Sequence, residues 1–206
     1  MTRVITYIDG FNLYFGLRSK GWRKYYWLDL HQLSVSLLKT GQHLVTVHYF
    51  TTYIRANGRN TDDMHRQVLY IEVIKTRPLL TLHLGHYLDK PRRCHQCGAT
   101  WTDYEEKMTD VNIATQLLAD AYDDRFDTAL IISADSDLTT PVAQVRRRFP
   151  HKRVIIAEPP GRRSTALRQA ASGYLRIGEN KFRASQLPDT VQRADGFALM
   201  RPSQWR

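Results

Sequence analysis

The stretch YIDGFNLYFGL, residues 7–17, places an acid where a buried strand is expected to end. The mostly apolar run Arg3–Ile8 predicts that strand, and Asp9, Gly10 and Asn12 come soon after it. An ionised carboxylate is costly to bury unless another group pairs with it. The question is therefore which partner Asp9 has, and whether that partner serves the structure or a function.

Short apolar runs alternate with segments of helical periodicity along the rest of the chain, which is typical of a parallel sheet with crossover helices. Further strands are predicted at Leu44–Thr51, Leu80–Tyr87, Thr128–Ala134, Arg153–Ala157 and Tyr174–Ile177. Helices are predicted at Leu30–Lys39, Asp62–Thr76, Asp110–Asp123, Pro141–Phe149 and Ser164–Ala171. Residues 1–187 are expected to form one domain, with the polar residues 90–107 as an insertion. Residues 188–206 form a C-terminal tail that either docks, swaps to a second subunit or stays loose.

The composition narrows the class of protein. A chain of 206 residues is long enough for one domain with a full hydrophobic core. Its formal charge of +10 favours a polyanionic partner, with nucleic acid as the leading candidate. Two cysteines provide no disulfide framework, which indicates an intracellular protein. Because the sequence shows neither a signal-peptide pattern nor an apolar stretch near the ~20 residues that span a bilayer, we expect a cytoplasmic protein without a membrane partner.

Three further aspartates are placed where they can join Asp9. Asp135 and Asp137 lie near the end of the stretch ALIISADSDL, and Asp110 begins the apolar stripe of a helix in EEKMTDVNIA. In an open parallel sheet, ligands bind beyond the carboxyl ends of the strands. We therefore expect all four acids at this edge of the sheet. Each acid taken alone also fits a helix cap or a turn, and it is their convergence from three segments that favours a site.

Several ionised carboxylates in one place repel one another and need a compensating cation. Lys107 is one candidate, but Mg²⁺ or Mn²⁺ fits better because these hard ions prefer carboxylate and water oxygens. Such a site activates a water and stabilises the charge of an in-line attack on a phosphodiester. We therefore expect Asp9 to be accommodated at the strand end because a metal ion neutralises it.

The motifs YIDGFNLY, EEKMTDVNIA and ISADSDL, in this order, resemble those of the NYN domain family, a branch of the PIN-like nucleases. The resemblance covers the chain from Arg3 to about Gln186. It implies a PIN-like, Rossmann-like fold: a three-layer α/β/α sandwich with a mainly parallel central sheet. It also implies metal-dependent endonucleolytic cleavage of RNA that leaves 5′-phosphate and 3′-hydroxyl ends. The alternative is a catalytically silent module on the same fold that binds RNA or recruits a partner. A small-molecule phosphatase fits least, since the first strand is not followed by a D-x-D pattern.

The resemblance also implies roles for individual residues. The four implied metal ligands, with the two central ones first, are Asp9, Asp135, Asp110 and Asp137. Asn12 would hydrogen-bond a ligand, a water or the scissile phosphate, and Ser133 and Ser136 would orient the acids. Family members commonly have glycine where Ala134 stands here, a departure that leaves the acids in place.

Basic and aromatic residues alternate in RKYYW, residues 23–27, where cations can follow phosphates and rings can stack on bases. The alternative is that Tyr26 and Trp27 pack under the next helix. A second basic group follows the strand that ends near Ala157, and therefore lies at the same edge as the acids. The residues predicted to hold RNA phosphates are Arg18, Lys20, Arg23, Arg162, Arg163 and Arg168.

The segment RRCHQCGATW, residues 92–101, has the C-x-x-C-G shape of a zinc knuckle, with Cys94 and Cys97 as its ligands. Structural zinc normally takes four ligands, and the chain has no second cysteine pair. His83, His86 or His95 could complete the site, as could a second subunit in a homodimer. The missing ligands favour a reduced thiol pair without Zn²⁺ over a zinc site.

Overall fold

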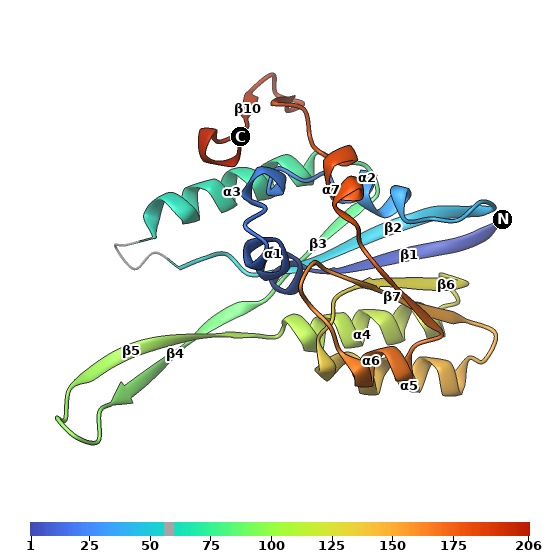
Figure 1. The fold of residues 1–206 in the computed structure, drawn as a ribbon, viewed down its shortest axis with the longest axis horizontal. Helices are drawn as coiled ribbons and strands as arrows, with labels where there is room; N and C mark the ends of the chain where they lie inside the picture. The colour runs from blue at the N-terminus through green and yellow to red at the C-terminus, as the bar shows by residue number, and fades with distance from the viewer. Residues whose placement is uncertain (56–59) are drawn as a thin grey trace.

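The computed structural model describes residues 1–55 and 60–206, and for residues 103–106 the backbone alone. Six parallel strands form the central sheet in the order β3-β2-β1-β6-β7-β8 (Figure 1). These strands are β1 (Thr2–Asp9), β2 (Gln42–Thr51), β3 (Leu80–Leu84), β6 (Thr128–Ile132), β7 (Arg153–Glu158) and β8 (Gly173–Arg176). Two antiparallel pairs stand apart from the sheet: β4 (His86–Arg93) with β5 (Thr100–Lys107), and β9 (Thr190–Gln192) with β10 (Ala198–Met200).

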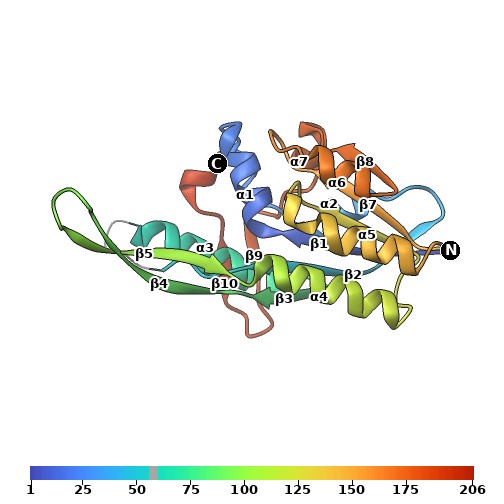
Figure 2. The same ribbon diagram turned by 90° about the horizontal axis from the view of Figure 1, so that it is seen from below.

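Helices cover both faces of the sheet, which confirms the predicted three-layer α/β/α arrangement (Figure 2). The helices are α1 (Gly10–Ser19), α2 (Leu30–Ser36), α3 (Thr61–Lys75), α4 (Thr109–Tyr122), α5 (Thr139–Arg148), α6 (Thr165–Ala170) and α7 (Glu179–Ala184). One core contains side chains of α1, α2, α3 and α7, and the other contains side chains of α4, α5 and α6. Strand β1 lies between the two cores, with Val4 and Ile8 in the first and Ile5 and Tyr7 in the second. The near-continuous apolar sequence of β1 follows from this burial on both sides.

The order of the strands reverses between β1 and β6. From β1 the chain continues to β2 and β3 on one side, whereas β7 and β8 follow β6 on the other. Ile8 pairs with Ile132 near the carboxyl ends of these two neighbouring strands. The loops that follow β1 and β6 therefore leave the sheet side by side, at the switch point where open α/β sheets place their ligands.

The region predicted as one strand, Leu80–Tyr87, is divided in two. The backbone N–H of Gly85 donates to the carbonyl of Thr51, and the chain then leaves the sheet. Strands β4 and β5 form a hairpin that extends away from the body of the molecule in both views (Figures 1 and 2). This hairpin includes the predicted polar insertion and begins four residues before it.

Three further features of the structure bear on the sequence prediction. Helices α1 and α7 are present although neither was predicted. The C-terminal tail docks on the first core, where Val191, Leu199 and Trp205 are buried. Within the described residues, no helix is both long and apolar enough to cross a membrane.

Candidate metal centre

Three aspartates from three separate segments meet at the switch point. Asp9 is the last residue of β1, Asp110 lies in the first turn of α4, and Asp135 follows β6. Each offers a carboxylate oxygen, and these three oxygens all lie within 4.8 Å of one another. Asp9 is buried, and the other two acids are half-buried. We refer to Asp9, Asp110 and Asp135 as the acidic trio.

Local structure explains how the acidic trio forms. Asp9 and Asp135 come together because β1 and β6 are adjacent parallel strands. Asp110 follows the hairpin in the chain, and Met108 is the residue that directly precedes α4. The φ of Met108 is 83°, in the left-handed region that residues other than glycine rarely adopt. This turn directs the start of α4, and with it Asp110, towards the edge of the sheet.

Hydrogen bonds fix the Asp9 carboxylate from both sides. Its Oδ1 accepts from the backbone N–H of Asn12 at 2.9 Å, so Asp9 also caps α1. Its Oδ2 accepts from the buried Ser133 hydroxyl at 2.9 Å. The Ser133 Oγ in turn accepts from the N–H of Asp135 at 3.0 Å. The partners of Asp9 therefore include the loop after β6, and through Ser133 two members of the trio hold each other in position.

Asn12 connects the same two loops. Its side-chain Oδ1 accepts from the backbone N–H of Ala134 at 3.1 Å. Asn12 also lines the acidic pocket described below, so it can contact a molecule bound there. Asn12 therefore connects the carboxyl ends of β1 and β6 through this hydrogen bond.

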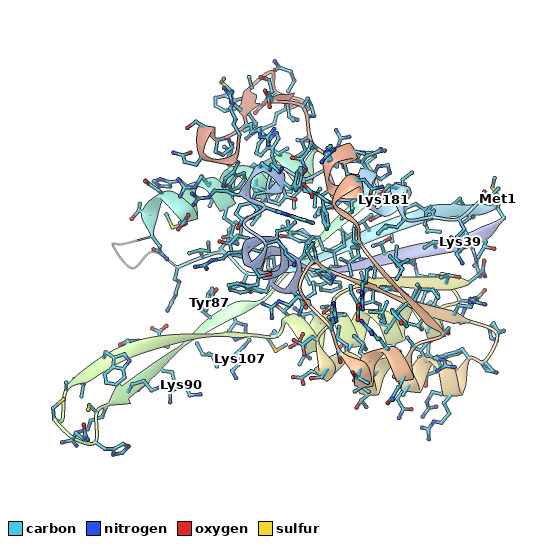
Figure 3. All side chains as sticks on the ribbon, in the orientation of Figure 1. Met1, Lys39, Tyr87, Lys90, Lys107 and Lys181 are labelled. Carbon is cyan, nitrogen blue, oxygen red and sulfur yellow. The ribbon has the colours of Figure 1, made fainter. Side chains whose placement is uncertain are left out.

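The remaining members of the predicted acidic group lie further out. Asp137 is exposed and is not part of the trio, and its backbone N–H donates to Asp135 Oδ1 at 3.0 Å. That bond caps the short 3₁₀ helix η2 (Ser136–Leu138), in which Ser136 is also exposed. Lys107 is half-buried and pairs with His86 in the β4–β5 ladder, and Figure 3 shows Lys107 near the base of the hairpin.

A pocket of about 180 Å³ opens over the trio. Its lining consists of Asp9, Phe11, Asn12, Phe15, Thr109, Asp110, Asp135 and Arg162. The guanidinium carbon of Arg162 lies 5.8 Å from the centre of the Phe15 ring. The lining of this acidic pocket thus combines three carboxylates with the guanidinium of Arg162.

A larger pocket of about 650 Å³ lies on the other side of Phe11 and Phe15, which line both pockets. We call it the aromatic pocket, since its lining includes Tyr14, Tyr26, Tyr49, Tyr70, Tyr87 and Trp205. Burial raises the pKa of Tyr49 and of Tyr26 to about 12, so both remain neutral phenols near pH 7. No spacing along the chain predicts this pocket, because its walls include residues of α1, β2, α3 and the far C-terminus.

Five of the six predicted phosphate-binding residues fall into three groups. Arg18 and Arg23 line the aromatic pocket, and Arg162 lines the acidic one. Lys20 and Arg163 are exposed near the ends of the loops around these pockets. Trp27, by contrast, is fully buried and donates to the carbonyl of Pro188, as the packing alternative for RKYYW predicts, whereas Tyr26 lines the aromatic pocket.

Arg168 has a structural partner. Its guanidinium donates two hydrogen bonds to the carboxylate of Glu158, at 2.5 and 2.6 Å, and Glu158 is almost fully buried. The same guanidinium lies 4.4 Å from the centre of the Tyr174 ring. Glu158 explains why an arginine is needed at this position, so the charge of Arg168 neutralises an internal acid.

A buried polar group that the sequence analysis did not identify lies under α4. The Tyr7 hydroxyl donates to Asp120 Oδ2 at 2.7 Å, and His48 Nε2 lies 3.2 Å from the same oxygen. His48 Nδ1 is 2.9 Å from His83 Nε2. Burial, together with the neighbouring His48, lowers the pKa of His83 to about 4. His83, which is half-buried, is therefore neutral at pH 7.

Comparisons with known proteins agree with this architecture. Residues 3–178 match the family model described as NYN domain. Among curated proteins, this chain is similar to the 6-hydroxy-3-succinoylpyridine 3-monooxygenase HspA of Pseudomonas putida (strain DSM 28022 / S16). The two sequences are 26% identical, and the alignment covers 98% of this chain and 75% of HspA. Among solved structures, a protein of unknown function from Vibrio parahaemolyticus RIMD 2210633 has a TM-score of 0.52 and 19% identity, with 90% of this chain and 96% of that chain covered. This last likeness is one of fold.

Proposed function

From the premise that this chain belongs to the NYN domain family of PIN-like nucleases, we propose that it is a metal-dependent endoribonuclease. The observation that carries the proposal is the acidic trio, three carboxylates from distant segments with oxygens within 4.8 Å of one another. Three like charges this close repel, and a pocket opens above them. A divalent cation would relieve that repulsion.

The donor set fits Mg²⁺ or Mn²⁺. The trio offers only carboxylate oxygens, which hard divalent ions prefer, and contains no histidine or cysteine. Asp9, Asp110 and Asp135 would hold the ion, with the exposed Asp137 as a further acid at the outer side. When bound, such an ion activates a water and offsets the negative charge of a phosphodiester under attack.

The residues of the chain itself would have three roles. Ser133 and Asn12 keep Asp9 and the loop that carries Asp135 at a fixed separation through their hydrogen bonds. Such preorganisation means that little movement is needed when substrate binds. Arg162 would pair with a substrate phosphate beside the trio, and Arg18 and Arg23 would follow the phosphates further along the strand.

The direct test is incubation of the purified protein with labelled single-stranded RNA and hairpin RNA in Mn²⁺, in Mg²⁺ and in chelator. We expect cleavage that needs a metal ion and that Asp9→Asn and Asp135→Asn each abolish. Asp123→Asn is the matched control, because Asp123 is exposed at the opposite end of α4 and the charge change is the same. Cleavage that survives in chelator, or in both trio variants, would contradict the proposal.

The same samples distinguish a nuclease from a silent binding module. A silent module would bind RNA tightly with or without metal and give no products. In both cases, binding that uses the arginines should weaken steeply as salt is raised, because each phosphate contact releases counterions.

A second candidate function is chemistry on a small aromatic substrate. Two observations favour it: the aromatic pocket has a volume of about 650 Å³, within the range of small-molecule sites, and one relative is named as a monooxygenase of a hydroxypyridine. Arg18 and Arg23 at the pocket would suit a carboxylate on such a ring. Thermal unfolding with 6-hydroxy-3-succinoylpyridine tests this candidate. A rise in melting temperature that Tyr14→Ala removes would support it, and an unchanged melting temperature would exclude it for this compound.

A further inference from the structure

The β4–β5 hairpin is a surface that the proposed function does not use. It projects from the body, and Figure 3 shows Tyr87 and Lys107 near its base with Lys90 further out. A two-stranded hairpin is marginally stable alone in water. This one nevertheless exposes Leu88 by 49% and Trp101 by 53%. The pairing of Arg92 with Trp101 places both apolar side chains on the same face, since Leu88 is four residues from Arg92.

The tip of the hairpin has the hydrogen bonds of a metal-binding knuckle. Hydrogen bonds from the backbone N–H groups of Cys97 and Gln96 and from the Cys97 thiol lower the pKa of the Cys94 thiol. The turn closes through the N–H of Cys94 to Ala99 and the N–H of Gly98 to Cys94. Gly98 has a φ of 72°, which explains why glycine follows the second cysteine. Neither cysteine is in a disulfide, and Cys97 is exposed.

A single copy of the chain cannot complete a four-ligand site from the histidines of the hairpin and sheet. His86 stands at the opposite end of β4, about 23 Å from Arg93 for seven steps along a strand. His83 lies in β3 with its Nε2 directed at His48. Among the described side chains, the acidic trio is the one group of three or more potential metal ligands. His95, on the knuckle itself, is exposed and is tested below.

We propose that Cys94 and Cys97 supply half of a tetrahedral zinc site, and that a second copy of this chain supplies the other half. Two hairpins would then meet at their tips, with one Zn²⁺ bound by four thiolates. Each copy lacks two ligands that an identical copy provides, and a symmetric dimer is the commonest way for a soluble chain to complete a shared site. The proposal does not depend on RNA cleavage.

The charges at the tip suit this arrangement. Arg92 and Arg93 directly precede Cys94, and a guanidinium nitrogen of Arg93 lies 3.8 Å from where a Cβ on Gly98 would stand. Two basic tips would repel each other without an anion between them. A zinc ion with four thiolates carries a net charge of −2, so the metal centre itself would offset half of the +4 charge of the four arginines. The exposed Trp101, which pairs with Arg92, would then lie near the joined tips, whereas Leu88 lies five residues before Arg93, about 17 Å further back along β4.

The test measures zinc content and molecular mass together on the full chain, reduced with a phosphine and titrated with Zn²⁺. We expect 0.5 zinc per chain and a mass twice the 24.0 kDa of one chain. Chelation should remove the zinc and return the mass to that of one chain. Cobalt substitution should give a thiolate charge-transfer band with the intensity of four thiolates per ion.

Variants separate this site from the acidic trio. Cys94→Ser and Cys97→Ser should each lose both the zinc and the dimer but keep the circular dichroism spectrum and melting temperature of the body, because the tip lies outside both cores. His95→Ala should keep both. Asp135→Asn should also keep the zinc-linked dimer, so loss of cleavage there leaves this proposal standing.

Four results would overturn the proposal. One zinc per monomer, or loss of zinc in His95→Ala, would mean a site completed within one chain. A dimer that persists in chelator or in both cysteine variants would mean a different interface. A chain that takes up no zinc at a stoichiometric amount would mean a thiol pair without metal.

Discussion

Replacing Asp135 by asparagine should make the metal-free protein more stable and at the same time abolish its response to metal. The side chain keeps its shape, and Asn Oδ1 can still accept the N–H of Asp137, so the cap of η2 survives. What is lost is one negative charge from the acidic trio. Higher stability without metal, combined with loss of the stabilisation by metal, is specific to a site in which like charges repel one another.

The size of the gain follows from the distances. Two unit charges 4.8 Å apart repel by about 0.9 kcal/mol at the dielectric constant of water and by about 3.5 kcal/mol at an effective value of 20. Asp135 takes part in two such pairs and is half-buried, so the lower end, about 2 kcal/mol in total, is the better guide. Small losses in capping leave about 1–2 kcal/mol, which in a chain of this length raises the melting temperature by about 2–8 °C.

Metal should reverse the order of stability. An ion at one hundred times its dissociation constant stabilises the wild-type protein by about 2.7 kcal/mol, and the variant has lost one of three anionic ligands. Thermal unfolding at low ionic strength, with chelator and then with Mn²⁺, measures both effects. Asp123→Asn is the control and should shift the melting temperature by the wild-type amount on addition of Mn²⁺. If Asp135→Asn lowered the metal-free melting temperature, lysines or arginines would already neutralise the trio, and the reasoning would be refuted.

Three other predictions concern the surroundings of the site. Ser133→Ala should lower the free energy of unfolding, measured in urea, by about 1–3 kcal/mol, because the Asp9 carboxylate and the Asp135 N–H lose the hydroxyl that they share. A decrease of less than about 0.5 kcal/mol would contradict this. The free energy of unfolding should fall as pH drops from about 6.5 towards 4, because the unfolded chain binds a proton at His83 in that range and the folded chain does not until about pH 4. His83→Gln should make the free energy of unfolding depend less on pH in this range. An unchanged pH dependence in the variant would exclude His83 as its cause. Arg168→Ala should lower the melting temperature far more than Arg163→Ala, because only the first removes both hydrogen bonds to the buried Glu158 and leaves it with Arg176 at 3.8 Å. Equal effects would show that the Arg168–Glu158 ion pair adds nothing.

The main features of the site could be predicted because they depend on local pattern and on a general rule of sheet topology. An apolar run followed by Asp9, and another followed by Asp135, indicates two strand ends, and parallel strands place their carboxyl ends at the same edge. Asp110 could be added because its helix has an apolar stripe that begins with it. The separation of Asp137 from the trio could not be predicted, since spacing alone does not show which of two acids two residues apart turns inward.

Features that depend on contacts between distant segments were not visible in the sequence. The aromatic pocket needs Tyr14 of α1, Tyr49 of β2, Tyr70 of α3 and Trp205 of the tail, and no spacing along the chain connects them. Arg168 was expected at the substrate because its strand ends at the right edge. The structure pairs it with Glu158, and a partner ten residues away in sequence is recognised only when the strand and helix between them are in place.

The structural and the functional explanations of the acids do not exclude each other. Asp9 caps α1 through Asn12 and Asp135 caps η2 through Asp137, so each acid does what the structural interpretation predicts. A carboxylate oxygen carries two lone-pair positions, so a bond from a backbone N–H does not prevent the same group from binding an ion. Because the caps are bonds within the protein, they hold the carboxylates in place before any ion arrives, at the expense of the repulsion estimated above. The three carboxylate oxygens, all within 4.8 Å of one another, are therefore preorganised for a divalent ion that would relieve this repulsion.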